Sequence, residues 1–435
     1  NYPSFGRSDG SWSEGWRYWI GSIDRHIFPI WGLSDALGIP LNKHPYFANT
    51  GYFKIYSNPP WSRMMPFGDL HNQSTGTGDG NVVETFGILL RNPDYAWYGA
   101  QTRRLSGAGA RSLDAQDVLT FDEGVLKGLA GKAKIGELPL GRVFPETGLA
   151  VLRTSLESGA GDVQFMLKSN PYGSVSHAHS DQGNFYLAVD GHPLLIPSGH
   201  YQEGHEALYA SPHHAGWTWQ SWAHNVPLVD GKGQARSENA AGQIEHFFSS
   251  ALASYVRADA TRSYAAENGE EARRVLPEFA PELLKRTGSA PVTSYRRSVL
   301  FLRPNLFVMY DDMQADRAVT MNWLLHSWNR FAIDEPSGTV TAAEGAVKAH
   351  VRILAGASTR IAQSNEFLIP LPEKYRKQWH LTASLPASRH HNVIGVISAL
   401  RGDEAPAGAT AVSGAGWHGA SLRLAGGAAA MAAFA

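Results

Sequence analysis

The sequence of 435 residues contains no cysteine. This absence excludes a disulfide scaffold, a thiol nucleophile, a zinc site with cysteine ligands and an iron–sulfur cluster. No apolar run reaches the roughly 18 residues of a transmembrane helix, so we expect none. Charged residues make up only 18%, and 38 Lys+Arg against 39 Asp+Glu give a formal net charge of −1. This balance argues against a general nucleic-acid binder, which carries a basic surface.

Hydrophobic residues make up 43% of the chain, and it contains 13 Trp and 18 His. This is enough for a large core, and the length favours two or three domains. The chain starts with Asn1 rather than Met, and no signal peptide is visible. We therefore expect a processed or truncated product.

The first third of the chain has helical periodicity. A buried-face stripe runs from Trp16 to Trp31, and Pro29 is expected to kink or end that helix. A second stripe, Val82–Leu90, should stop at Asn92-Pro93, and a weaker helix is predicted over 94–104. The polar, glycine-rich stretch Gly68–Gly80 between these stripes is predicted to be a surface loop.

The period changes to two from about residue 142. Short apolar runs are separated by Gly, Pro, Asn and Asp, and they predict strands at 163–167, 185–189, 194–196, 226–229, 247–256, 295–302, 306–310, 319–325, 338–354 and 393–400. Arg303-Pro304-Asn305 predicts a hairpin turn. The predicted class is α+β, with a helical domain over 1–140 and an antiparallel β-sandwich over 141–435.

Histidine marks two candidate sites. Ser176–Gly183 holds His177, His179 and Asp181, and in a strand the two histidines would share one face, as metal ligands or as polar groups in a cleft. A second cluster places tryptophans beside polar groups, which suits sugar stacking but also suits a core: His213, His214, Trp217, Trp219, Trp222, His224 and Asn225. Tyr18 is a third candidate, as an acid or base or as a packed aromatic.

Several of these segments together resemble the heparinase II/III-like polysaccharide lyases, and are closest in motif to exo-acting oligoalginate lyases and related heparin lyases. They are Asp9–Trp19, Ser176–Gln182, Ile196–Tyr201, Ser211–His214, Ala223–Gln234, Tyr295–Val299 and Trp323–His326. The resemblance implies the C-terminal part of an incomplete (α/α) toroid, followed by a large antiparallel β-sandwich, with the active cleft between them.

The resemblance also implies β-elimination at a 4-linked uronic acid. Tyr18 would be the catalytic acid, and also the base in a syn reaction, while His177 would neutralise the carboxylate or share in base work. Substrate would contact Trp16, Arg17, His213, His214, Trp217 and Asn225. The chemistry requires no cofactor. Relatives with a structural zinc suggest His179 and His224 as ligands, but Pro197 occupies the position of the expected Asp, for which His200 or Asp181 would have to substitute.

The expected partner is a uronate-containing oligosaccharide or polysaccharide, with alginate first and heparin or heparan sulfate as the alternative. The resemblance further implies a missing toroid half that contains a catalytic histidine and comes from before Asn1 in the same protein or from another chain, and it leaves a homodimer open. The charge balance and the lack of a long apolar run predict no nucleic acid or membrane partner. The expected location is the bacterial periplasm or outside the cell, with the cytoplasm as alternative. Two other classes stay open. A glycoside hydrolase would need two facing carboxylates from among Glu14, Asp69, Glu84 and Asp181, and the third class is a non-catalytic glycan-binding protein.

Overall fold

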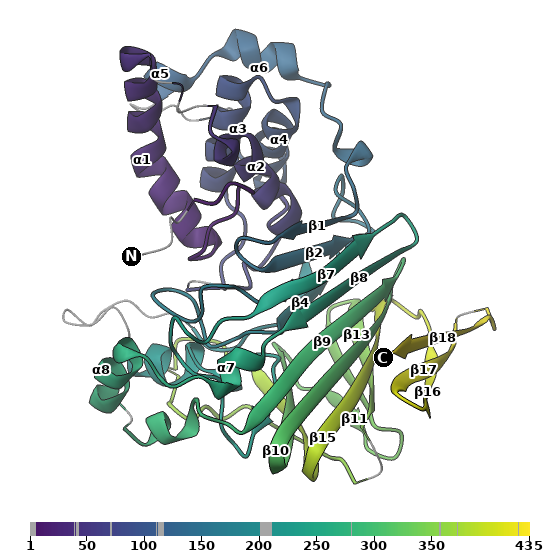
Figure 1. Cartoon of the computed structure of the whole chain (residues 1–435). Coiled ribbons are helices and arrows are strands. Elements are labelled where there is room, and N and C mark those ends of the chain that lie inside the picture. The colour runs from purple at the N-terminus through teal and green to yellow at the C-terminus, as the bar shows by residue number, and fades with distance from the viewer. Residues whose placement is uncertain are drawn as a thin grey trace. The chain divides into compact units, whose positions relative to one another are not determined.

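The computed structural model describes residues 6–38, 40, 43–69, 72–109, 111, 117–200, 211–279, 281–355, 358–371, 373–424 and 426–435, without the side chains of 24–30, 118–119 and 278–279. The chain divides into two compact units. Unit 1 is helical and comprises Asn1–Pro139 and Ser155–Asp162. Unit 2 is mostly sheet and comprises Leu140–Thr154 and Val163–Ala435 (Figure 1).

The described helical elements of unit 1 are α1 (Trp16–Leu37), α2 (Pro45–Ser57), α3 (Thr77–Leu90), α4 (Pro93–Ser106), α5 (Asp117–Thr120), α6 (Glu123–Leu129) and the 3-10 turn η2 (Ile135–Glu137). The predicted end of α1 at Pro29 is wrong, because the helix continues to Leu37, and the kink expected as the alternative stays a prediction. Trp31 and Ser34, which follow the proline, are buried. Packing of this last stretch offsets the hydrogen bond that a proline removes.

Helices α3 and α4 form where the sequence predicts them. Arg91 closes α3 in the left-handed conformation, and the Asn92 side chain accepts a hydrogen bond from Asp94 N at 2.9 Å, which caps α4. The predicted loop over Gly68–Gly80 is too long, since α3 already begins at Thr77. Helix α2 was not predicted, because its buried residues lie on several faces rather than in one stripe.

Unit 2 contains a five-stranded antiparallel sheet in the order β1-β2-β3-β4-β5. Its strands are β1 (Gly141–Phe144), β2 (Leu149–Arg153), β3 (Val163–Lys168), β4 (Asn184–Val189) and β5 (His192–Leu195). The strands are short and, in β2 to β4, buried along their whole length. This sheet is therefore one inner layer of the unit.

A ten-stranded sheet runs in the order β11-β12-β13-β15-β10-β9-β8-β7, with β14 paired to β15 and β6 to β10. Its strands are β6 (Leu228–Val229), β7 (Gln243–Ser249), β8 (Ala253–Asp259), β9 (Val292–Leu302), β10 (Leu306–Ser327), β11 (Ala332–Asp334), β12 (Thr339–Glu344), β13 (Val347–Leu354), β14 (Arg360–Ser364) and β15 (Trp379–Arg401).

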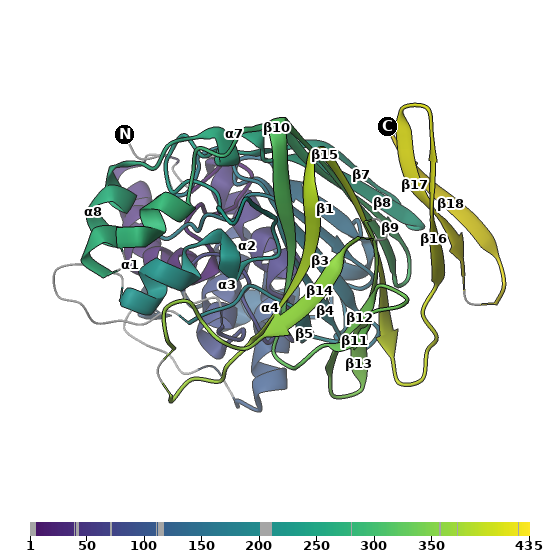
Figure 2. The ribbon, with the colours of Figure 1, turned by 90° about the horizontal axis from the view of Figure 1, so that it is seen from below.

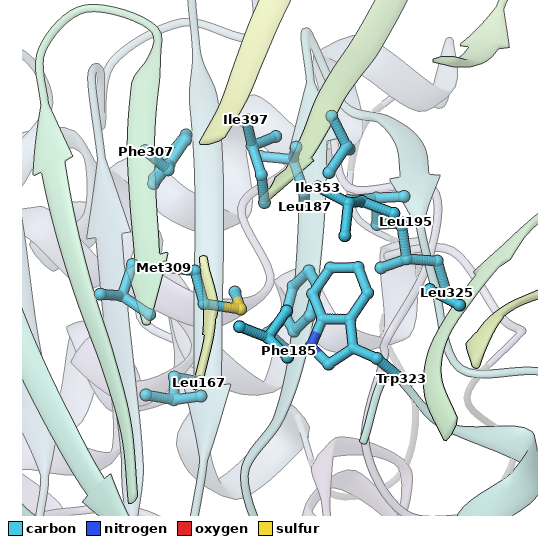
Figure 3. Packing of buried hydrophobic residues seen from close by; sticks show 14 of the residues in the cluster. Leu167, Phe185, Leu187, Leu195, Phe307, Met309, Trp323, Leu325, Ile353 and Ile397 are labelled. Carbon is cyan, nitrogen blue, oxygen red and sulfur yellow. The ribbon is translucent and has the colours of Figure 1, made fainter. Parts of the chain in front are cut away.

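The core of unit 2 lies between these two sheets, which confirms the predicted sandwich. Phe185 and Leu187 of the small sheet pack in one cluster with Phe307, Met309 and other residues of the large one (Figure 3). A third layer lies beside the large sheet (Figure 2). It is a three-stranded sheet of β16 (Gly408–Gly414), β17 (Trp417–Arg423) and β18 (Ala429–Phe434). Its apolar residues pack against the outer face of β10 and β15.

Strand lengths in the large sheet differ from the prediction. Two predicted strands, 306–310 and 319–325, are parts of the continuous strand β10, which pairs along β15 with register shifts after Gln314. The predicted run 247–256 is instead the β7–β8 hairpin, while the turn at Arg303-Pro304-Asn305 is confirmed by the β9–β10 pairing. Helical elements lie in two of the connections between strands. The β5–β6 connection contains η3 (His214–Thr218) and η4 (Ser221–Ala223), and the β8–β9 connection contains α7 (Thr261–Ala265), α8 (Glu270–Phe279) and η5 (Pro281–Arg286).

Candidate active site

The segment around His177 is a tight turn and not a strand. Ala178 N donates to Val175 O at 3.0 Å, and Ser176 has a positive φ of 53°. As a result the two histidines of this segment do not share a face. His177 is half-buried, whereas His179 is buried. His177 thus keeps accessible surface, and His179 belongs to the interior.

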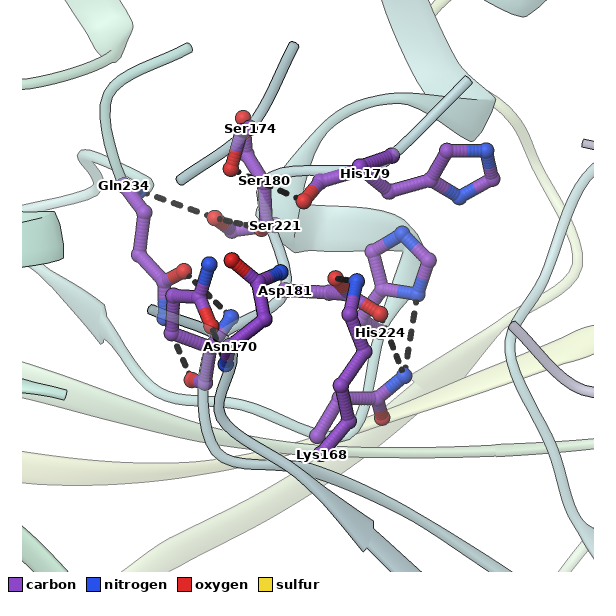
Figure 4. Close-up of polar contacts among 12 residues, drawn as sticks. Lys168, Asn170, Ser174, His179, Ser180, Asp181, Ser221, His224 and Gln234 are labelled. Carbon is purple, nitrogen blue, oxygen red and sulfur yellow. Dashed lines mark hydrogen bonds and ion pairs between the residues drawn. The ribbon is translucent and has the colours of Figure 1, made fainter. Parts of the chain in front are cut away.

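A buried polar network follows this turn (Figure 4). Lys168, at the end of β3, forms an ion pair with Asp181, and Asn184 Nδ2 donates to the other carboxylate oxygen at 3.2 Å. Burial opposes ionisation of Asp181, but the Lys168 ammonium outweighs it and holds the pKa of the carboxyl below its usual range. Sequence reasoning missed Lys168 and Asn184. The available signal was a lysine that ends an apolar strand.

His224 uses both of its ring nitrogens inside this network. Nε2 lies 3.1 Å from Thr218 O, so it carries the proton, and Nδ1 accepts from Asn184 Nδ2 at 3.3 Å. Burial lowers the pKa of His224 to about 3, against the opposing effect of Asp181. The predicted metal role of His224 therefore does not fit, since neither nitrogen is left to coordinate. Pro197 offers no ligand and Asp181 is bound to Lys168.

The metal role of His179 stays a prediction. Its ring lies 5.2 Å from that of His224 and 5.9 Å, edge-on, from that of His214. His214, predicted to contact substrate, is fully buried and packs edge-on against Trp219 at 5.2 Å. This position fits a role inside the protein rather than contact with a glycan.

Asn225, also predicted to bind substrate, joins two parts of unit 2. Its Nδ2 donates to Phe185 O at 2.8 Å, and its Oδ1 accepts from His326 N at 2.9 Å. The side chain is fully buried. We correct the interpretation of Asn225 accordingly: the amide holds the loop after His224 against strands β4 and β10.

His213 and Trp217 lie in a compact aromatic cluster rather than on a sugar-binding surface. Trp217 contacts Phe367 and His380 with ring centroids 5.0 and 4.7 Å apart, and its Nε1 donates to Ser198 Oγ at 3.2 Å. His213 Nδ1 lies 2.8 Å from Ile369 O. Burial lowers the pKa values of His213 and His380 to about 4, so both rings are neutral at pH 7.

In unit 1, helix α1 presents its predicted site residues on different faces. The Trp16 indole is buried, donates to Ser57 Oγ and stacks on Phe53 at 5.8 Å, which makes it a core residue rather than a substrate contact. Arg17 is exposed and Tyr18 is half-buried. Among the residues predicted to be catalytic or to contact substrate in a lyase, Arg17, Tyr18 and His177 are the ones that are not buried.

Two of the four carboxylates that a hydrolase would use, Glu84 and Asp181, are engaged in ion pairs. Glu84 is buried and receives both prongs of Arg103, at 2.8 and 2.5 Å, together with Arg111 at 3.3 Å. Asp181 is bound to Lys168. Neither of these two carboxylates is placed to protonate a glycosidic oxygen or to activate water, so this pair does not support the hydrolase alternative.

Residues 137–367, more than half of the chain, match the family model described as "Heparinase II/III-like, C-terminal". The chain belongs to the heparinase II/III-like family. No curated protein sequence matches it significantly. Within the described ranges, each helix is too short or too polar to serve as a membrane span.

Three solved structures have a similar fold at 14% sequence identity. A heparinase III gene product matches with a TM-score of 0.71, over 99% of this chain and 58% of that one. Heparan sulfate lyase HepC from Pedobacter heparinus also gives 0.71, over 99% and 60%. A structure named heparinase III gives 0.70, over 99% and 61%. The chain thus spans about three fifths of the length of these proteins.

Proposed function

We propose that this protein is a polysaccharide lyase that cleaves 4-linked uronic acid glycans by β-elimination, with heparan sulfate or heparin as the substrate class. Membership of the heparinase II/III-like family supports the lyase activity. The names of the similar structures, heparinase III and heparan sulfate lyase, favour a glycosaminoglycan over the alginate expected from the sequence motifs. We also propose that helices α1 to α4 are part of an (α/α) toroid.

The observation that carries this proposal is the accessibility of Arg17, Tyr18 and His177 among predicted site residues that are otherwise buried. In β-elimination a base removes the proton on C5, a C4–C5 double bond forms, and O4 leaves with a proton. We assign both proton transfers to Tyr18: its phenolate takes the C5 proton, and the hydroxyl formed in that step then donates a proton to the leaving O4. His177 binds the uronate carboxylate, and the charge it neutralises makes the C5 proton more acidic. Arg17 binds an anionic group of the glycan.

The first experiment incubates the full-length protein with heparan sulfate, heparin and alginate oligosaccharides, and follows the ultraviolet absorbance of the 4,5-unsaturated uronate. We expect a rise with a glycosaminoglycan. A rise with alginate alone would overturn the substrate class. New reducing ends without the absorbance would show that the protein is a hydrolase and not a lyase. If neither signal appears, the protein binds glycans without cleaving them. The lengths of the products distinguish exo from endo action.

Two pairs of variants test the assigned roles. Tyr18→Phe should lower kcat by about three orders of magnitude or more, because a general acid–base group typically contributes a factor of 10² to 10⁴. The control Tyr52→Phe removes a hydroxyl that donates to Asp94 in the same unit, and it should leave kcat unchanged. His177→Ala should lower kcat strongly, whereas His246→Ala, at an exposed position of β7, should not. Full activity of Tyr18→Phe would exclude the mechanism.

Tyr18 and His177 belong to different units of the chain. Whether they act in one reaction is therefore tested by kinetics. If both contribute to the same chemical step, the double variant should lose little more activity than the more impaired single variant, because residues that act as one unit are strongly non-additive. Fully additive losses would mean that the two residues act independently.

A further inference from the structure

We propose that Arg236 positions His177, and that Glu271 of helix α8 holds Arg236 in place. For its catalytic consequence this inference rests on the proposed lyase function. Arg236 lies 59 positions after His177 in the chain, and its guanidinium reaches back to the turn that carries the histidine. We therefore regard Arg236 as a positioning residue, since its contacts are to the backbone of the turn.

The guanidinium binds the peptide on both sides of His177. One nitrogen, Nη1, donates to Ala178 O at 2.7 Å, and the other, Nη2, donates to Ser176 O at 2.5 Å. The two bonds fix the orientation of the peptide groups that flank the histidine. They also stabilise the left-handed conformation of Ser176, which a non-glycine residue adopts only where its surroundings impose it.

Arg236 is itself fixed from two sides. Its guanidinium carbon lies 3.6 Å from the centroid of the Trp219 ring, in a stacked cation–π contact, and its Nη2 forms an ion pair with Glu271 Oε2 at 2.9 Å. The Arg236 side chain is fully buried, and that of Glu271 is 22% exposed. A buried arginine with these partners has little freedom to move, so the turn it binds is rigid.

Helix α8 gains a role from this arrangement. Its apolar residues Ala272, Val275 and Leu276 pack with Trp219 in a small separate core, which places Glu271 beside Arg236. The helical segment between β8 and β9, which includes α8, therefore helps to hold His177 in position although it lies far from His177 in the sequence. Trp219 and α8 hold Arg236 in place, and Arg236 in turn binds the turn that carries His177.

The planar fork of arginine is the feature that matters. Lysine has a single ammonium group and cannot donate to Ser176 O and Ala178 O in the same geometry, although it keeps the charge. We expect Arg236→Lys to lower kcat on the order of a hundredfold, because small misplacements of a catalytic group have effects of that size. KM should change much less. The control Arg401→Lys affects a two-pronged pair with Asp190 in the same unit and should leave kcat unchanged.

A second measurement does not depend on turnover. Nuclear magnetic resonance of the His177 ring, assigned by comparison with His177→Gln, reports its pKa and its mobility. Arg236→Lys should broaden or shift this signal, and Arg401→Lys should not. If the wild-type protein proves to have no lyase activity, the proposed function fails, while the His177 signal still tests the positioning role.

Glu271→Gln gives an independent test if Arg236→Lys does not fold. This substitution removes the ion pair but leaves Arg236 in place, so kcat should fall by a smaller factor and the His177 signal should shift in the same direction. Unchanged kcat together with an unchanged His177 signal in a folded variant would overturn the inference. Lower thermal stability with both readouts unchanged would give Arg236 a purely structural role, and would overturn it as well.

Discussion

The Arg297 guanidinium and the Asp311 carboxylate form a two-pronged ion pair inside the β-sandwich, with Nε–Oδ1 and Nη2–Oδ2 distances of 2.6 Å each. The remaining nitrogen of Arg297 donates to the carbonyl oxygens of Gly183 and Asn225, both at 2.6 Å. Burial opposes the charge on Arg297, but Asp311 outweighs it and raises the pKa of the guanidinium. The pair thus links the large sheet to the loops that follow His179 and His224.

Removing one partner of this pair should destabilise the protein strongly. Arg297→Met leaves the Asp311 carboxylate buried without its cation, and we expect a loss of about 3–5 kcal/mol in the free energy of unfolding. Urea unfolding monitored by tryptophan fluorescence measures it. The double variant Arg297→Met/Asp311→Leu should recover part of the loss. Lys127→Ala, which removes an exposed pair with Glu123, should barely move the midpoint.

Acid should destabilise unit 2 through its buried histidines. Burial lowers the pKa of His224 to about 3 and those of His213 and His380 to about 4. An unfolded histidine titrates near pH 6.5, so between about pH 6.5 and pH 4 the unfolded chain binds protons that the folded protein does not. Stability therefore falls as the pH falls, by about 1.4 kcal/mol per pH unit for each histidine.

The test of this pH dependence compares urea midpoints at several pH values in that window. His380→Gln should show a slope shallower than wild type by one proton, because glutamine does not titrate. His246→Gln, at an exposed position, should retain the wild-type slope. Equal slopes for wild type and His380→Gln would contradict the assignment.

The close contact of α3 and α4 predicts a steric effect. A Cβ on Gly99 would lie 2.5 Å from Glu84 Cβ and 2.8 Å from Gly80 O, so Gly99→Ala must push the helices apart. We expect a loss of about 1–3 kcal/mol in stability. The control Gly128→Ala adds a methyl group in α6 where nothing lies within 4 Å, and it should stabilise that helix by up to about 1 kcal/mol. Equal stabilities of the two variants would refute the packing account.

Substitutions of Arg17 and Trp217 should have different effects: the first on substrate binding and the second on stability. Arg17→Ala removes an exposed cation and should raise KM for an anionic glycan roughly tenfold or more, because a hydrogen bond to a charged group contributes about 1.5–3 kcal/mol. Trp217→Ala leaves a cavity beside Phe367 and His380 and should lower stability by about 3–5 kcal/mol without a matching change in KM. Steady-state kinetics and thermal unfolding on the same samples test both. The reverse pattern would restore Trp217 as a substrate contact.

Local patterns were sufficient for part of the fold. The stop of α3 at Asn92-Pro93 and the turn at 303–305 depend on the conformations of a few adjacent residues, so the sequence predicts them. Helix α2 escaped prediction because burial on several faces leaves no apolar stripe. The full length of β10 also escaped, because pairing with β15 maintains the strand through a stretch that has no clear alternation.

The residues of the sequence already contain the chemistry of the candidate site: a tyrosine near the start of an amphipathic helix, two histidines close to an aspartate, and no cysteine to compete with them. Accessibility was decided by tertiary structure alone. The turn at Ser176 leaves His177 accessible and His179 buried. Partners distant in the chain bind other candidates: Lys168 pairs with Asp181, His326 donates to Asn225, and Ser57 accepts from Trp16. The periodicity of apolar residues indicates which face of a helix or strand a residue occupies. Its burial depends on contacts with residues that are distant in the chain.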